Sequence, residues 1–100
     1  MGSGVKVPVV DRSGDYTIYY EGLETPIGLM TFVHCDLHTR WSRTIKNKLR
    51  DDFESLLALR HEPLYCLRHD NKQEKFIRMF GFRYSYGIPE HGVDVYILEI

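Results

Sequence analysis

The sequence predicts a mixed α/β protein of the α+β type, with a largely antiparallel sheet and two helices in the order β-β-β-α-β-α-β-β. Two stretches carry apolar residues at helical spacing, and the segments around them are rich in β-branched and aromatic residues separated by turn residues. Because helices and strands are interleaved within 100 residues, they are expected to share one core.

Composition favours an ordinary globular domain, with 43% hydrophobic and 27% charged residues. The net charge of -1 argues against a protein that as a whole coats nucleic acid or membrane. No apolar run approaches the roughly 20 residues that span a bilayer. Residues 5–100 are predicted to form a single domain, residues 1–4 are expected to be an expression-tag remnant, and the cytoplasm is the expected compartment.

The first three strands are predicted from propensity and turn chemistry. Val5–Val10 is β-branched but contains a proline, which favours an edge strand or an extended arm. Asp11–Asp15 has turn chemistry, and Tyr16–Tyr20 has strong strand propensity. Glu21–Pro26 is expected to connect to the next strand, Ile27–Cys35. Because this strand is almost continuously apolar, it is expected to be covered on both faces.

A long helix is predicted over Trp41–Arg60. Thr39 or Ser42 is suited to cap its start, and Glu62-Pro63 is expected to end it. A short buried strand, Pro63–Leu67, is expected to follow. One apolar stripe defines the helix, and it consists of Trp41, Ile45, Leu49, Phe53, Leu56 and Leu57.

The second helix is predicted from a capping box at Asp70–Gln73. Phe76, Ile77 and Phe80 form its buried stripe, and Gly81 stands where a left-handed residue is favoured after a helix. A strand with alternating aromatic residues is expected to begin at once and to turn at Gly87–Gly92. Three residues are expected to alternate outward along the last strand: Val93, Val95 and Ile97.

Two segments of this pattern resemble the GNAT acetyltransferase superfamily. "DNKQEKFIRMFGF" is similar to its late helix, and "RWSRTIKNKLRDDFESLL" stands where that family has its central helix. The chain is more closely similar to the short GNAT-like proteins of tailed phages, including acetyltransferase-like internal virion proteins, with a Trp and a Ser before a basic helix. The resemblance covers about Tyr16–Ile100 and implies a GNAT-like fold with acetyl-CoA as cofactor.

The resemblance also implies which residues would hold the cofactor. In the family the pyrophosphate sits on a glycine-rich loop at the start of the central helix. The matching segment here, Asp36–Ser42, contains no glycine and includes the bulky Trp41. The resemblance assigns cofactor binding to residues near the two helix starts, namely His38, Thr39, Arg40, Ser42, Arg43 and Asp70.

The family's proton donor is a Tyr seven residues after the start of the late helix. That position is Ile77 here, and an isoleucine cannot transfer a proton. Glu21 and Glu24, which precede the long apolar strand, are the candidate general bases. The chemistry of the family is therefore expected to be incomplete.

Five basic residues crowd the start of the central helix: Arg40, Arg43, Lys46, Lys48 and Arg50. Positive charge at a helix N-terminus opposes the macrodipole, which favours a bound anion or an acidic partner. The alternative is a solvated face balanced by pairs such as Lys48–Asp52. Either reading remains open from sequence.

The aromatic residues of the last hairpin offer a second candidate surface. Tyr84, Tyr86 and Tyr96 are expected either to stack across the hairpin or, if exposed, to bind a protein. His34, Cys35 and His38 lack an evident fourth ligand, so no metal site is predicted. Cys35 and Cys66 are expected to be reduced, half-buried thiols.

Two functions follow from these residues. The first is a catalytically degenerate GNAT-like protein of phage type that binds a protein partner as a virion component or host-directed factor. Its contact residues would be Arg40, Arg43, Lys46, Arg50, Tyr84 and Tyr86. The second is an active acetyl-CoA-dependent N-acetyltransferase that acts on an amine. Pairing of the Val5–Val10 edge between two copies is a further possibility, and nucleic acid is not an expected partner.

Overall fold

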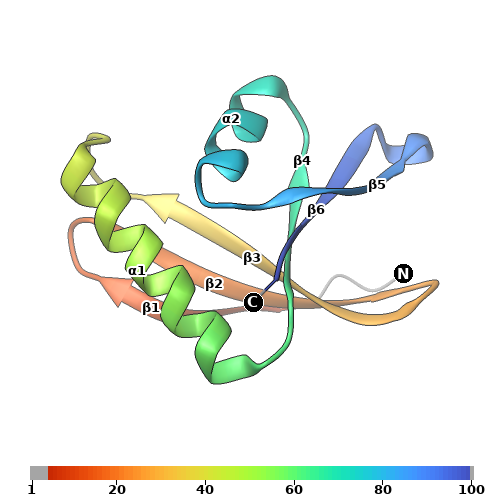
Figure 1. Ribbon diagram of the computed structural model, residues 1–100, viewed down its shortest axis with the longest axis horizontal. Helices are drawn as coiled ribbons and strands as arrows, with labels where there is room; N and C mark the ends of the chain where they lie inside the picture. Colours follow the sequence, from red (N-terminus) through yellow and green to blue (C-terminus); the bar gives the residue numbers. More distant parts are fainter. Residues whose placement is uncertain (1–4, 100) are drawn as a thin grey trace.

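The computed structural model describes residues 5–99, apart from the side chains of Asn71 and Lys72, so the predicted tag remnant lies outside the described residues. The predicted element order is confirmed (Figure 1). The elements are β1 (Lys6–Arg12), β2 (Tyr16–Thr25), β3 (Gly28–Leu37), α1 (Arg43–Arg60), β4 (Leu64–Arg68), α2 (Asn71–Met79), β5 (Arg83–Ile88), a single 3₁₀ turn (Pro89–His91) and β6 (Val93–Leu98).

The strands form one six-stranded sheet in the order β1-β2-β3-β4-β6-β5. Every neighbouring pair is antiparallel except β3 and β4, which run parallel at the centre and are joined through α1. The prediction of a largely antiparallel sheet is therefore confirmed. β1 lies at one edge, as its proline favoured, with a bulge between Pro8 and Val10.

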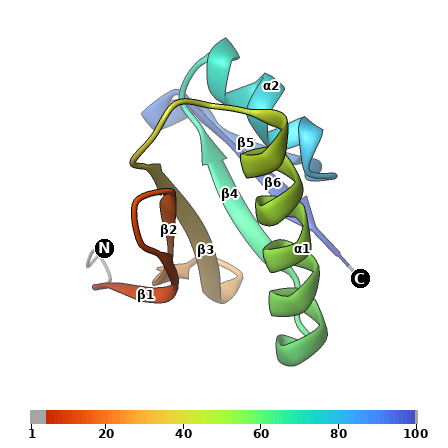
Figure 2. The same cartoon turned by 90° about the vertical axis from the view of Figure 1, so that its left-hand side faces the viewer.

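Both helices pack on the same face of the sheet, here called the helix face. The apolar stripe of α1 is buried there, and Ile77 of α2 and Phe80, which follows that helix, join the same cluster. Figure 2 shows the first turn of α1 close to α2. The sheet contributes Tyr16, Ile18, Val33, Leu64, Tyr96 and Leu98 to this core.

The opposite face, here called the open face, carries a smaller apolar cluster. Met30, Phe32 and Val95 are buried in it, beneath half-buried residues from β2, β4 and β5. The middle of β3 is thus covered on both faces, as its apolar run predicted. The outward orientation expected for Val95 is wrong, because β6 lies between β4 and β5 and the side chain is 0% exposed.

The connection expected at Glu21–Pro26 is also wrong. β2 continues through Thr25 and pairs with β3 in unbroken register, so only Pro26 and Ile27 form the turn. The Thr25 hydroxyl accepts the Ile27 N–H at 3.3 Å and donates to the Gly28 carbonyl at 2.8 Å. Gly28 has a φ of 116°, which its lack of a side chain permits. Local turn chemistry therefore ends the strand five residues later than expected.

The helix ends follow from caps that the sequence contains. α1 begins at Arg43 rather than Trp41, because Ser42 is its N-cap and the Ser42 Oγ accepts the Ile45 N–H at 3.2 Å. Asp70 caps α2 by accepting the Gln73 N–H at 2.9 Å. The Gln73 side chain reaches back as predicted, but to the His69 N–H at 2.6 Å.

A buried polar cluster fastens the β1–β2 hairpin to α1. The Arg12 guanidinium donates to both Asp52 carboxylate oxygens, at 2.8 and 2.7 Å, and the buried Tyr16 hydroxyl donates to the same carboxylate. We call Arg12, Tyr16 and Asp52 the clamp. The predicted Lys48–Asp52 pair is wrong, because Asp52 faces the sheet and Lys48 pairs with Asp15 at 2.8 Å.

Candidate binding cleft

The parallel strands β3 and β4 separate soon after they meet. Their register has one matched position, Phe32 opposite Tyr65. Both strands continue beyond that point, to Leu37 and Arg68, and Figure 1 shows their carboxyl ends pointing apart. The sheet is therefore split at its centre, on the side where the loop to α1 begins.

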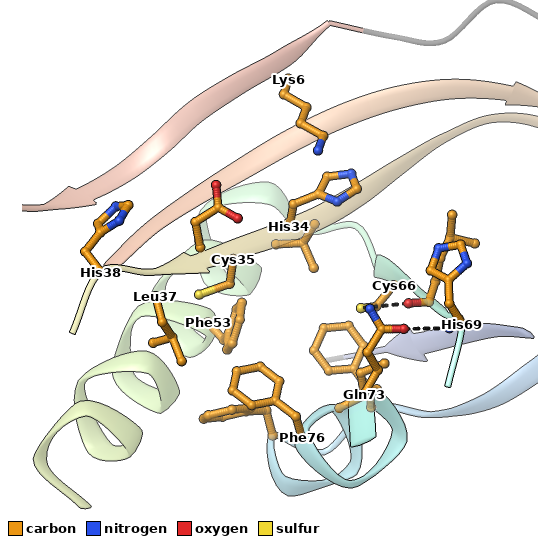
Figure 3. Close-up of a pocket in the computed structure, with 16 residues that line it drawn as sticks. Lys6, His34, Cys35, Leu37, His38, Phe53, Cys66, His69, Gln73 and Phe76 are labelled. Carbon is orange, nitrogen blue, oxygen red and sulfur yellow. Dashed lines mark hydrogen bonds between the residues drawn. The ribbon is translucent and has the colours of Figure 1, made fainter. Parts of the chain in front are cut away.

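A cavity of about 860 Å³ occupies this split. Its walls are β3 and β4, and its floor is formed by apolar residues of the two helices and the segment that follows α2 (Figure 3). The lining residues are Lys6, Val33, His34, Cys35, Asp36, Leu37, His38, Phe53, Cys66, Leu67, His69, Gln73, Phe76, Ile77, Phe80 and Phe82, and together they define the cleft.

The cleft passes between the strands rather than lying on one face of the sheet. Successive residues of a strand point to opposite faces. His34 and Cys35 are neighbours on β3 and both line the cleft, as do Cys66 and Leu67 on β4. Side chains of both faces therefore border the same opening, with the main chain of each strand between them.

One histidine of β3 and one directly after it are held by polar partners on the open face. The His34 Nε2 lies 2.8 Å from the Glu21 carboxylate, and the His38 Nε2 lies 2.8 Å from the Thr17 hydroxyl. That hydroxyl is also 3.3 Å from Asp11, to which it donates. His38 directly follows the end of β3 at Leu37, and both histidines line the cleft.

The two cysteines stand on opposite walls of the cleft (Figure 3). Both are unpaired and half-buried, as predicted. Burial raises the pKa of Cys35 to about 12, with smaller contributions from Asp36 and Cys66, and burial likewise raises the pKa of Cys66 to about 12. Both thiols are therefore protonated at neutral pH and unsuited to act as nucleophiles.

The start of α1 is closed off by an aromatic contact. The Trp41 ring packs edge-on against Phe76 and Phe80 of the α2 region, with centroid distances of 5.4 and 6.3 Å. Both phenylalanines line the cleft. Trp41 remains 37% exposed and stands immediately before the Ser42 cap. The indole thus fills the space between the first turn of α1 and α2.

Some of the predicted catalytic and cofactor residues reach the cleft, and the others lie away from it or cap a helix. Glu21 reaches the cleft through its contact with His34, and its side chain is 12% exposed. Glu24 lies near the β2–β3 turn and is absent from the lining of the cleft. His38 lines the cleft, while Thr39 and Arg40 are exposed in the loop that follows it. Ser42 and Asp70 both act as helix caps.

Five basic residues lie at or near the start of α1, and one of them has a carboxylate partner among residues 5–99. Lys48 is paired with Asp15 at 2.8 Å. The other four have no carboxylate within ion-pair distance among residues 5–99, and they are Arg40, Arg43, Lys46 and Arg50. Arg40 and Arg43 flank Trp41 in the sequence, and neither is among the residues that line the cleft.

The tyrosines of the last hairpin do not form one surface. Tyr84 packs edge-on against Tyr96 at a centroid distance of 5.9 Å and is 53% exposed. A bulge between Tyr84 and Tyr86 turns Tyr86 to the open face, where its hydroxyl lies 3.4 Å from the Met30 sulfur. A three-residue stack is therefore not formed, because the bulge breaks the alternation.

No site predicted from the sequence included Cys66, His69 or Gln73, although all three line the cleft. Cys66 and His69 lie on and after the short strand β4, whose separation from β3 has no sequence signal. Within the described residues no group of three metal-ligating side chains is assembled. The helices of that same region are too short or too polar to cross a membrane.

Comparison of this chain with protein-family models, with curated proteins and with solved structures found no match. The motifs of the sequence and the geometry of the cleft are therefore the features that bear on function.

Proposed function

We propose that this protein is a catalytically degenerate GNAT-like protein of phage type that binds a protein partner and does not transfer an acyl group. The observation that carries this proposal is the position of Trp41. An acyl-CoA enzyme of this type needs open backbone N–H groups at the start of the central helix to hold the pyrophosphate. Here Trp41 packs against Phe76 and Phe80 at that place, and the Ser42 hydroxyl already occupies the Ile45 N–H.

The position expected for the proton donor supports the same conclusion. Ile77 is 4% exposed and belongs to the main core. The nearby thiols have pKa values raised to about 12, so neither Cys35 nor Cys66 supplies a ready nucleophile. The cleft retains the volume and apolar floor of a binding site without these groups.

The motif similarity to short phage proteins supports a role in the virion or in the host cytoplasm. Mass spectrometry of purified particles from a phage that encodes the chain tests this part. Stoichiometric presence in the particle indicates a virion component, whereas absence indicates a factor that acts in the infected cell.

Acetyl-CoA binding decides the central point of the proposal. Thermal melting with and without millimolar acetyl-CoA should show no shift, whereas a ligand at a thousandfold excess over its dissociation constant stabilises by about 4 kcal/mol. Pantetheine, which lacks the phosphates, is the matched control. A shift with acetyl-CoA that pantetheine does not produce, and that Arg43→Ala removes, would overturn the proposal.

One observation favours the second function, an N-acetyltransferase. The Glu21–His34 contact at 2.8 Å brings an imidazole and a carboxylate to the cleft, and such a pair is suited to take a proton from an amine. In that case Glu21, and not Glu24, is the base. Acetyl transfer to a panel of amines that is lost in Glu21→Gln but kept in Glu24→Gln would support this function.

A further inference from the structure

The free edge of β3 is the feature that identifies a ligand for the cleft. In an antiparallel pair, successive residues direct their N–H and C=O groups alternately toward the partner strand and away from it. The His38 N–H donates to the Asp15 carbonyl at 2.8 Å, so His38 belongs to the set that faces β2. Counting back by two, Asp36 and His34 face β2 as well, so the intervening residues Cys35 and Leu37 belong to the set that faces away from β2.

On that side β3 has no partner over its last residues. The parallel register with β4 ends at Phe32 and Tyr65, and within the described chain no other strand takes its place. The main-chain groups of Cys35 and Leu37 therefore border the cleft without a strand partner. An unpaired strand edge is satisfied best by the main chain of another extended segment.

We propose that the cleft binds an extended peptide segment of a partner protein, which adds to the edge of β3 and buries one large apolar side chain. The inference rests on the proposed function and names the kind of partner. Residues of an extended peptide alternate between the two faces. One side chain then points to the floor at Phe53, Phe76 and Phe80, and the next points to the open face near His34.

Charge favours a peptide with acidic residues beside the apolar one. The charged residues that line the cleft, Lys6 and Asp36, balance each other, and Glu21 lies against His34 at its edge. The unbalanced positive charge is on Arg40 and Arg43, which flank Trp41 in the sequence, and Trp41 contacts Phe76 of the cleft; no carboxylate within residues 5–99 lies within ion-pair distance of either arginine. Acidic residues on the peptide complement this charge.

The same charges argue against a second copy of this chain as the occupant. Its extended edge strand, Lys6–Arg12, carries two basic residues and one acidic residue. This strand has no excess of acidic residues with which to complement Arg40 and Arg43. An acidic peptide from another protein is the better match.

Selection from a display library of short random peptides tests the proposal. Peptides enriched on the wild-type protein should share one large apolar residue with acidic neighbours. Cys35→Phe and Cys66→Phe fill the cleft from opposite walls, and each should weaken an enriched peptide by about tenfold or more in fluorescence polarisation. Leu29→Phe, at an exposed position near the far end of β3, is the matched control and should bind normally.

Main-chain pairing is tested on the unaltered protein. Methylation of single backbone nitrogens in an enriched peptide should weaken binding by about tenfold at alternate positions and leave the others nearly unchanged. Raising salt from about 0.1 M to about 1 M should weaken binding, and Arg40→Ala with Arg43→Ala should remove most of that dependence.

Three outcomes would overturn the inference. The first is enrichment that is equal on wild-type and Cys35→Phe protein, and the second is indifference to every backbone methylation. The third is a concentration-dependent dimer that Cys35→Phe abolishes, which would assign the cleft to a second copy. Each leaves the proposed function standing if acetyl-CoA causes no melting shift, whereas such a shift removes the proposed function whatever the peptides do.

Discussion

The clamp and the cleft lie on opposite sides of β3. They differ in whether their polar groups have hydrogen-bond partners within the protein. At the clamp, Asp52 is satisfied by Arg12 and by Tyr16, and the surrounding side chains are closely packed. At the cleft, Cys35 and Leu37 border an open space, and among residues 5–99 no strand pairs with β3 there on the side away from β2. The difference indicates that one side stabilises the fold and the other is left available for binding.

The largest test of this comparison is a truncation on the packed side. Leu49 of α1 is 0% exposed within the main core, so Leu49→Ala should lower the free energy of unfolding by about 3 to 4 kcal/mol. Leu59→Ala is the matched control on the same helix, because Leu59 is 78% exposed, and it should cost less than about 0.5 kcal/mol. Urea denaturation measures both. Equal losses would contradict the assignment of the core to this side.

The clamp itself should give the next largest effect. Asp52→Ala leaves the buried Tyr16 hydroxyl without its acceptor, whereas the half-exposed Arg12 regains water. We expect a loss of about 2 to 3 kcal/mol in urea denaturation. Asp51→Ala, at the exposed neighbouring position, should change stability by less than about 0.5 kcal/mol. A loss below about 1 kcal/mol for Asp52→Ala would show that the hairpin is held by its apolar contacts alone.

Acid should weaken the clamp in a predictable direction. Hydrogen bonds from Arg12 lower the pKa of Asp52 below its usual value of about 3.9, against the opposing effect of burial. The contribution of the pair is therefore complete above that value and is lost as pH falls through the lower pKa of the folded state. The urea midpoint of the wild type should fall more steeply below about pH 4 than that of Asp52→Asn. Parallel curves would indicate that another carboxylate controls acid unfolding.

The parts of the fold that were predictable from sequence depend on local chemistry. The starts of α1 and α2 follow from Ser42 and Asp70, whose side chains cap the first turn of each helix. The buried stripe of α1 follows from helical spacing. Asp52 was interpreted as surface charge, although it lies three residues after Leu49 and four before Leu56 and so shares their face. The same helical spacing, used for charged residues as well as apolar ones, places Asp52 on the buried face of α1 and would have identified the clamp.

The parts that were not predictable depend on register between distant strands. The bulge that separates Tyr84 from Tyr86 has no glycine or proline to mark it. The divergence of β3 and β4 arises from the route of the chain through α1 and α2, which no local pattern encodes. Ile77 was the exception, because counting along the predicted helix identified it as a core residue before its burial was known.

The smallest expected effect is at the cleft. The labelling rates of its two thiols measure how far a reagent reaches into it. Because burial raises the pKa of Cys35 and Cys66 to about 12, the thiolate fraction at pH 8 is on the order of a thousandfold below that of an ordinary exposed thiol. Reaction with Ellman's reagent should be at least about a hundredfold slower in the folded protein than in urea. Cys35→Ala and Cys66→Ala separate the two rates, and each should cost only about 1 kcal/mol because the change removes one sulfur atom from a half-buried site. Labelling in the folded state as fast as in urea would contradict the burial of both thiols against the main core, and the side of β3 that borders the cleft would then be open as far as that core.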